Sequence, residues 1–288
     1  PIEDPAWLAW PLAPVRVAPG RPRHSATEFL TFSRCPRRHW FKYIRGVREP
    51  AVDRSTPEFM SAVTRGQIVH DVLEHLREEE ELDKLLEDAV GRWAPDAPPP
   101  EHPTGAELRR QIRAEVQAVA GHPDYRAVAD LPDARRELSF LYLHSDGAYA
   151  EGKIDLAAWR RGEGLVLVDV KTGCGGGASD VEARAAAYAP QRDVYVAAAD
   201  AVSPVRVTRF GFQFSEPAVQ VSGVIGEAER EAARRAFGEM LGRIRAGSAA
   251  EMPEKTAYPA ECRWCGYRRE GWCEGVGEIS RGTDRAHR

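Results

Sequence analysis

The chain has 288 residues, of which 43% are hydrophobic and 29% are charged. It is therefore large enough to bury one large core, or a core with a helical insertion. The formal net charge of −4 does not by itself indicate a nucleic-acid-binding protein. No apolar run is long enough to span a bilayer, and the first residues lack the pattern of a signal peptide. These features argue against a membrane protein and favour the cytoplasm.

Residues 1–24 are rich in Pro, Ala and Trp, and we expect them to form a linker or an arm. The chain begins at Pro1 without an initiator Met, which suggests a piece of a longer protein. The remaining residues, 25–288, are expected to form one domain. Its predicted parts are a helical part at about 61–130, a catalytic core at about 131–247 and a tail at about 251–275.

Helical patterns dominate the first half of this domain. A first helix is expected from about Ser25, and Pro36 suits the first turn of the next one. A longer helix is expected from about 61 to 80, and another from 107 to 120. The acidic stretch 77–88 is interpreted as a solvated helix face.

Strand patterns follow the helical part. Alternating or continuous apolar residues predict strands at about 137–143, 148–159, 165–170, 205–214 and 218–224. An Ala-rich helix is expected over 183–199, divided or kinked at Pro190. A charged amphipathic helix is expected over 227–246. Helices before and after a mixed sheet predict an α/β or α+β fold.

Two acidic motifs stand at the ends of neighbouring strands. Gly152-Lys153-Ile154-Asp155 is followed fourteen residues later by Asp169-Val170-Lys171-Thr172-Gly173. A hairpin between the strands brings Asp155 near Asp169, and alternation places Asp169 and Lys171 on one face. Such a group suits a divalent cation, Mg²⁺ or Mn²⁺, and a phosphate. The alternative is two strand-end caps with a lysine salt bridge, but two buried acids without a metal repel each other.

Two helices carry further polar residues at intervals of four. Gly66, His70 and Glu74 share one helix face, and the small residue lets the helix approach the sheet and aim His70 at the carboxylates. Gln191 and Tyr195 share a face of the helix after the sheet. Taken alone, each pair is also compatible with ordinary structural or surface residues.

A basic and aromatic segment lies near the start of the domain. Residues 34–48 carry six basic side chains and no acidic one: Arg34, Arg37, Arg38, Lys42, Arg45 and Arg48. Trp40, Phe41 and Tyr43 lie among them, so the segment is a candidate surface for phosphates and stacked bases. Arg37, Arg38 and Lys42 are the predicted DNA contacts, with Arg268 from the tail. The alternative is an amphipathic helix whose aromatic residues belong to the core.

Three of the five cysteines form a C-x2-C-x7-C group, at Cys262, Cys265 and Cys273. Three clustered thiols need a fourth ligand to complete a tetrahedral or cubane metal site. Zinc and iron–sulfur are both compatible with this spacing. Cys174 is interpreted as a free thiol, since an odd count and a cytoplasmic setting argue against disulfides.

The order of these motifs resembles the RecB-like branch of the PD-(D/E)XK nuclease superfamily. The chain presents a helix with G-x-x-x-H, a strand with G-x-I-D, a strand with D-x-K-T-G and a helix with Q-x-x-x-Y. The Ser33–Arg38 segment, followed by aromatic residues, is similar to the start of the nuclease domains of AddAB and AdnAB helicase–nucleases and CRISPR-associated exonucleases. The resemblance spans about residues 25–273 and implies a restriction-endonuclease-like mixed sheet flanked by helices.

This resemblance also implies roles for individual residues. It implies a metal site formed by His70, Asp155, Asp169 and the main-chain oxygen of Val170. Lys171, Gln191 and Tyr195 would act beside the metal on water and the scissile phosphate. Glu137 and Glu74 are candidate outer groups of this site.

The resemblance further implies a [4Fe–4S] cluster, held by Cys35 together with the three clustered cysteines. The expected function is hydrolysis of single-stranded or unwound DNA, as the nuclease module of a helicase–nuclease in double-strand break repair. No phosphate-binding G-x-x-x-x-G-K-[ST] loop occurs, so a helicase domain or subunit would be a partner. The alternatives are a stand-alone CRISPR-associated-type exonuclease and a catalytically idle DNA-binding scaffold.

Overall fold

The computed structural model describes residues 22–50, 61–145, 147–172, 180–248, 252–256, 259–263 and 265–276. The chain divides into two compact units. The first consists of Pro1–Ala26 with Arg54–Phe237, and the second of Thr27–Asp53 with Gly238–Arg288. The first unit contains the sheet, and the second contains the described cysteines.

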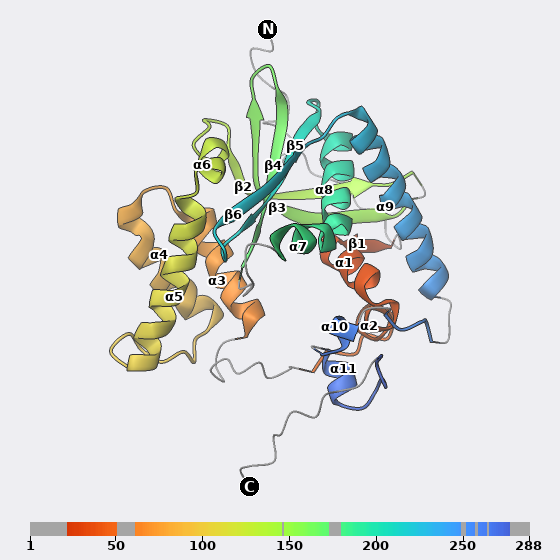
Figure 1. The fold of residues 1–288 in the computed structure, drawn as a ribbon, viewed down its shortest axis with the longest axis horizontal. Coiled ribbons are helices and arrows are strands. Elements are labelled where there is room, and N and C mark those ends of the chain that lie inside the picture. The colour runs from red at the N-terminus through yellow and green to blue at the C-terminus, as the bar shows by residue number, and fades with distance from the viewer. Residues whose placement is uncertain are drawn as a thin grey trace. The chain divides into compact units, whose positions relative to one another are not determined.

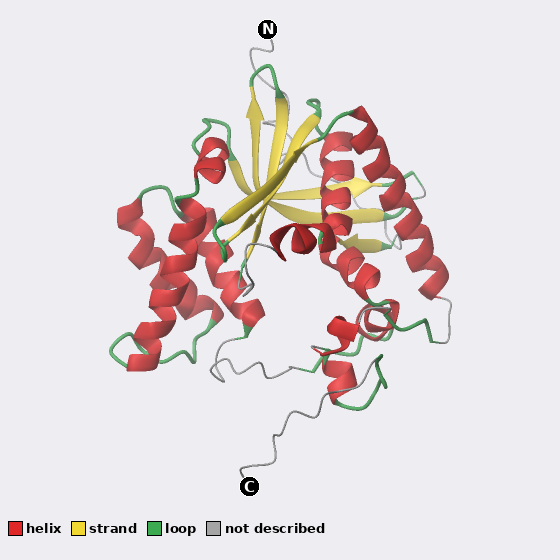
Figure 2. Cartoon of the chain, viewed as in Figure 1, coloured by secondary structure: helices red, strands yellow, loops and turns green. Residues whose placement is uncertain are grey.

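The described residues of the first unit form one mixed sheet (Figures 1 and 2). Its strands are β1 (Arg23–Ser25), β2 (Arg135–Leu143), β3 (Tyr149–Arg160), β4 (Gly164–Lys171), β5 (Val207–Phe214) and β6 (Val219–Val224). The order is β1-β3-β4-β5-β6, and β2 also pairs with β3. The β1–β3 and β4–β5 pairs are parallel and the others antiparallel. The expected α/β fold with a mixed sheet is confirmed.

The expected hairpin joins β3 to β4. Its turn requires glycine, because Gly162 and Gly164 have φ angles of +80° and +121°. The β3–β4 ladder runs from Arg160 opposite Gly164 to Leu156 opposite Val168 and ends there. Beyond this point β3 still pairs with β2, and β4 still pairs with β5. The sheet therefore forks between β3 and β4, next to Asp155 and Asp169.

Four helices pack on one face of the sheet (Figure 1). They are α3 (Ala62–His75), α4 (Leu82–Trp93), α5 (Pro103–Ala120) and α6 (Pro123–Ala129). Their apolar residues form one core with alternate residues of the two central strands, namely Leu156, Ala158, Val166, Val168 and Val170. Burial of these side chains stabilises the helical layer, because each removes apolar surface from water.

The predicted helix over 61–80 is too long. α3 ends at His75, because Leu76 adopts an extended backbone. A short 3₁₀ turn, Glu79–Glu81, then leads into α4. The stretch interpreted as a solvated helix face thus contains the start of α4, which buries Leu82, Leu86, Ala89 and Val90 on its inner side.

The other face of the sheet is covered by α7 (Val181–Ala187) and α8 (Ala189–Val202). The long helix α9 (Glu227–Ser248) follows β6 in the chain. Pro190 lies in the first turn of α8, which explains why the expected single helix is divided there. Tyr195 of α8 packs edge-on against Phe140 of β2, with ring centroids 5.7 Å apart. This contact orients the polar face of α8 relative to the sheet.

The second unit contains short helices. They are α1 (Ala26–Arg34), α2 (Pro36–His39) with the π-helical turn Trp40–Ile44, α10 (Pro259–Arg263) and α11 (Gly266–Arg269). Cys35 precedes Pro36 as the N-cap of α2, and its sulfur accepts a hydrogen bond from the Arg38 main chain at 3.4 Å. Throughout the described ranges, no helix has both the length and the apolar character needed to cross a membrane.

Candidate active site

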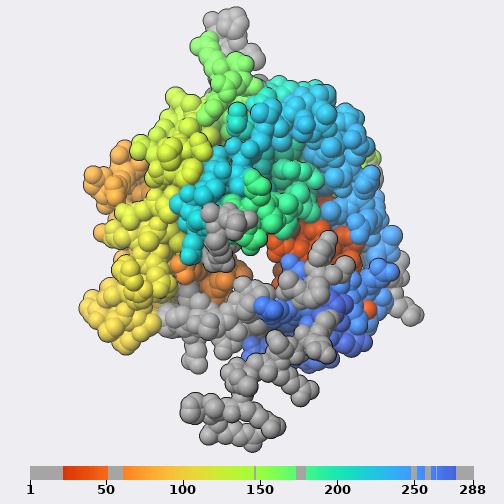
Figure 3. All heavy atoms as spheres, viewed as in Figure 1, coloured from red at the N-terminus to blue at the C-terminus, as the bar shows by residue number. Residues whose placement is uncertain are grey.

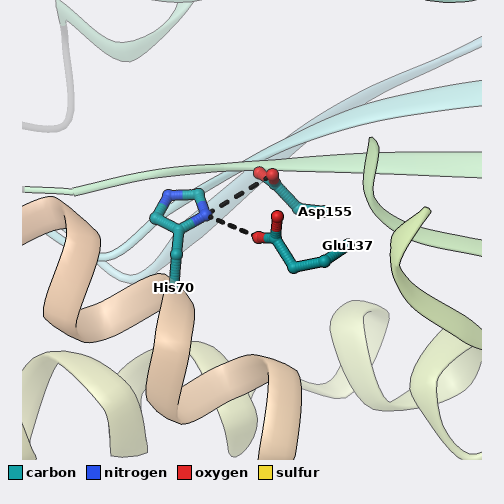
Figure 4. Close-up of side chains that lie close together, drawn as sticks. All are labelled: His70, Glu137 and Asp155. Atoms are coloured by element: carbon teal, nitrogen blue, oxygen red, sulfur yellow. Dashed lines mark hydrogen bonds and ion pairs between the residues drawn. The ribbon is translucent and has the colours of Figure 1, made fainter. Parts of the chain in front are cut away.

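His70 reaches the sheet from α3. A Cβ atom at Gly66, one turn earlier, would lie only 3.1 Å from Thr172 Oγ1, so the small residue permits the close approach of α3. His70 Nδ1 lies 3.4 Å from Asp155 Oδ1 and 3.4 Å from Glu137 Oε1 (Figure 4). One ligand atom from each of these three residues lies within 4.8 Å of the others. An imidazole and two carboxylates thus converge from a helix and two strands.

Asp155 stands at the fork of the sheet. Its Oδ2 accepts a hydrogen bond from the main-chain N–H of Val170 at 2.5 Å. A side-chain oxygen thereby takes the place of the ladder partner that β3 no longer provides beyond Leu156. Its other oxygen faces His70. The fork therefore lets a main-chain N–H of β4 and the His70 ring of α3 meet at one carboxylate.

Lys171 connects the sheet to α8. Its ammonium forms an ion pair with Asp169 and donates a hydrogen bond to Gln191 Oε1 at 2.8 Å. Gln191 Nε2 donates in turn to the hydroxyl of Tyr195 at 2.9 Å. The Lys171 Nζ also lies 4.4 Å from the centroid of the Tyr188 ring, at the start of α8. The structure thus brings Asp169, Lys171, Gln191 and Tyr195 into one buried chain of contacts.

The charges of these groups are strongly coupled. Burial opposes the charged form of His70, but Asp155 and Glu137 outweigh it and raise its pKa to about 10. Burial raises the pKa of Asp169 to about 6; the Lys171 charge opposes this shift and the Asp155 charge adds to it. Burial also opposes the charge of Lys171, yet Asp169 and Asp155 raise its pKa. The buried carboxylates of Asp155 and Asp169 are thus balanced by positive charge on neighbouring side chains.

Glu137 lies closer to the centre than its interpretation as a candidate outer group suggested. It contacts His70 and its backbone has a φ of +51°, the left-handed region that a side chain rarely adopts. Nothing in the periodicity of β2 signals this, because the conformation depends on the neighbouring elements. Glu74 lines one cavity together with His70, Glu137 and Asp155. The potential metal-binding atoms close to Glu74, however, belong to Asp71 and His75.

The described cysteines gather in the second unit. Cys35, Cys262, Cys265 and Cys273 are free thiols that line one cavity. They come from the ends of α2, α10 and α11 and from the turn after α11, which lie side by side in Figure 1. No three of these four described sulfurs lie within 4.8 Å of one another. Cys174 and Gly173 lie outside the described residues.

Three of the predicted DNA contacts also line the cysteine cavity. Arg37 Nε donates to Pro253 O at 3.0 Å, Arg38 Nε to Glu49 at 2.9 Å, and an Arg268 nitrogen to Val276 O at 3.2 Å. Lys42 is exposed, with its ammonium 5.1 Å from the centroid of the Tyr43 ring. The three arginines thus have structural partners, whereas Lys42 faces solvent.

The fold and the site together define a class. A mixed sheet that opens at two aspartates and a lysine, and is met there by a histidine, is the arrangement of nucleases that use divalent metal ions. The chain belongs to the PD-(D/E)XK nuclease superfamily, whose family model matches residues 23–274. It is accordingly a nuclease.

Comparison with solved structures supports the fold. The crystal structure of a candidate exonuclease from Eubacterium rectale aligns with a TM-score of 0.53 and 13% sequence identity, covering 82% of this chain and 84% of that one. At this identity the similarity shows the fold alone. The alignment with the crystal structure of a protein named SSO0001 covers 72% of this chain and 93% of that one at 11% identity. Its TM-score of 0.34 is too low to indicate a shared fold. No curated protein matches the sequence.

Proposed function

We propose that this protein hydrolyses phosphodiester bonds of DNA in single strands or in strands unwound from a duplex. The observation that carries the proposal is the convergence of His70, Asp155, Asp169 and Lys171 at the fork between β3 and β4. Phosphodiester hydrolysis needs positive charge at the phosphate and a positioned water, and this set of residues suits both needs.

His70, Asp155, Asp169 and the main-chain oxygen of Val170 are the proposed ligands of Mg²⁺ or Mn²⁺, with Glu137 beside them. Ligand atoms of His70, Asp155 and Glu137 lie within 4.8 Å of one another, and carboxylate oxygens together with one imidazole suit such an ion. The imidazole makes Mn²⁺ at least as acceptable as Mg²⁺. When bound, the ion supplies Lewis-acid charge that stabilises the negative charge developing on the phosphate.

Lys171 is proposed to position the attacking water and to stabilise the developing negative charge. Its ammonium is held by Asp169 on one side and by Gln191 on the other, so it cannot turn away from the site. Gln191 and Tyr195 hold one another and extend this polar line, which would orient water and the scissile phosphate. Burial of the line among apolar residues strengthens these interactions.

Cys35, Cys262, Cys265 and Cys273 are proposed to hold a [4Fe–4S] cluster that joins the two chain segments of the second unit. The four sulfurs line one cavity, as the ligands of a single metal centre would. Zinc is the alternative, because a tetrahedral zinc site also takes four thiolates.

The proposed family branch is RecB-like, and the proposed setting is the nuclease module of a helicase–nuclease in double-strand break repair, with a helicase domain or subunit as partner. The division into an arm at 1–24 and a nuclease domain at 25–288 belongs to this proposal. A stand-alone exonuclease of the CRISPR-associated type is the alternative, and the two differ in whether cutting depends on a helicase partner. An idle DNA-binding scaffold is disfavoured by the Asp169–Lys171 ion pair, which a scaffold does not need.

The test is cutting of end-labelled single-stranded DNA with Mn²⁺. We expect wild type to cut, and Asp169→Ala and Lys171→Ala to lose at least a hundredfold in rate. Lys84→Ala is the control for loss of a basic side chain, since Lys84 is exposed on α4 and does not line the cavity of the proposed metal ligands. Equal cutting by wild type, Asp169→Ala and Lys171→Ala would refute the proposed site.

A further inference from the structure

An exposed tryptophan lines the cavity of the proposed metal ligands. The cavity that contains His70 and Asp155 is also lined by Arg92 and Trp93, the last residues of α4. Trp93 is 39% exposed, and the side chain of Arg92 is 56% exposed. The space-filling view shows α4 and α5 (orange to yellow) at the surface (Figure 3). Neither residue has a part in the chemistry proposed above.

The Trp93 ring is held in one orientation. Its Nε1 donates a hydrogen bond to Asp71 Oδ2 at 2.7 Å, and Arg92 donates to the same oxygen. The Asp71 side chain is only 9% exposed and follows His70 directly in α3. A fixed aromatic ring loses little freedom when a ligand stacks on it, which favours binding. The indole is therefore preorganised beside the metal ligands.

The nearby acidic group does not offer a better explanation. Asp71, Glu74 and His75 have ligand atoms within 4.8 Å of one another, as a metal site would. However, the Asp71 carboxylate already accepts hydrogen bonds from Arg92 and Trp93. Its arrangement serves to hold the indole and the guanidinium rather than a second ion.

We propose that Trp93 stacks on an unpaired base of the strand whose phosphate lies at the metal centre, with Arg92 contacting a phosphate of the same strand. The proposal rests on the nuclease function proposed above and assigns single-stranded DNA as the form that enters this cavity. Every base has a π-face, so the contact does not depend on sequence. Paired bases are stacked within the duplex and cannot offer a face to the indole.

The experiment measures binding of an end-labelled 20-nucleotide single strand by fluorescence anisotropy, with Ca²⁺ replacing Mg²⁺. We expect Trp93→Ala to weaken binding roughly 5- to 150-fold and Trp93→Phe to retain most of the affinity. Val63→Ala is the matched control, because Val63 lines the same cavity, is 71% exposed and has no aromatic ring. It should bind as wild type does.

A series of strands with one abasic nucleotide at successive positions separates stacking from stability. Wild type should lose affinity at one position, and Trp93→Ala should lose nothing further there. A uniform loss at every position, or Trp93→Ala binding like wild type, overturns the proposal. If Trp93→Ala melts below the assay temperature, the wild-type series decides alone, and the absence of a sensitive position overturns the proposal. A wild type that neither binds nor cuts DNA refutes the proposed function itself, whereas normal cutting with no Trp93 effect refutes only the stacking.

Discussion

His70 is a proposed metal ligand, and its charge should make metal binding depend on pH. Its Nδ1 lies 3.4 Å from carboxylate oxygens of Asp155 and Glu137. Burial opposes protonation, but these carboxylates prevail and raise the pKa of His70 to about 10. The metal-free protein therefore carries an imidazolium at neutral pH. Since a metal ligand must be a neutral imidazole, binding of Mn²⁺ has to displace this proton.

The expected effect is large. Below pH 10, the apparent affinity for Mn²⁺ falls about tenfold for each unit by which the pH drops, because less of the imidazole is deprotonated. The affinity should thus rise about a hundredfold between pH 7 and pH 9. Titration calorimetry at pH 8, in two buffers of different ionisation enthalpy, should detect release of about one proton per ion. His70→Gln should release none, whereas His75→Gln, on the exposed end of α3, should behave as wild type. No proton release by wild type at pH 8 would refute the reasoning.

The raised pKa of His70 also makes the free energy of unfolding depend on pH. The folded-state pKa of His70, about 10, lies above its ordinary value of about 6.5. Its contribution to the free energy of unfolding is therefore fully present below pH 6.5 and is lost as the pH rises through about 10. The melting temperature of the metal-free wild type should fall over this window, and His70→Gln should show a smaller fall.

Three further predictions concern the hairpin, the cysteines and the ion. Gly164→Ala should lower the free energy of unfolding by about 1–3 kcal/mol in urea titrations, because the φ of Gly164 is +121° and its Cβ would meet Arg206 O at 2.8 Å. Gly223→Ala, with open space around it, should change little. Cys262→Ala should lose the visible absorbance of an iron–sulfur cluster, melt earlier and bind DNA more weakly; unchanged melting and affinity would contradict the cysteine proposal. EDTA should abolish cutting, and Mn²⁺ should restore it at least as well as Mg²⁺; cutting that persists in EDTA would contradict the metal site.

Much of the central architecture follows from local patterns. The continuous apolar run at 165–168 predicts β4, whose side chains alternate between the two faces of the sheet, and the Gly162–Gly164 turn predicts the hairpin that joins it to β3. The same alternation places Asp169 and Lys171 on one face, where the structure finds them in contact. These features depend on residues close in sequence, so the sequence contains enough information to predict them.

Other elements escape such patterns. β1 has only three residues, too few to show an alternation, and it pairs with β3 more than a hundred residues away. α4 begins directly after four glutamates, and its buried side is recognisable only once α3 and α5 provide the core that covers it.

The sequence by itself determined the two acidic strand ends, their lysine and the order of helices and strands around them, because strand alternation and helix periodicity act over a few residues. Only the tertiary structure decided that the sheet forks at Asp155, that Glu137 enters the centre in a left-handed conformation, and that α4 places Trp93 beside His70. The physical reason is that each of these depends on which elements pack together. The strand can open where it does because a carboxylate replaces the lost main-chain partner. The indole shares a cavity with a proposed metal ligand because α3 and α4 bury a common core.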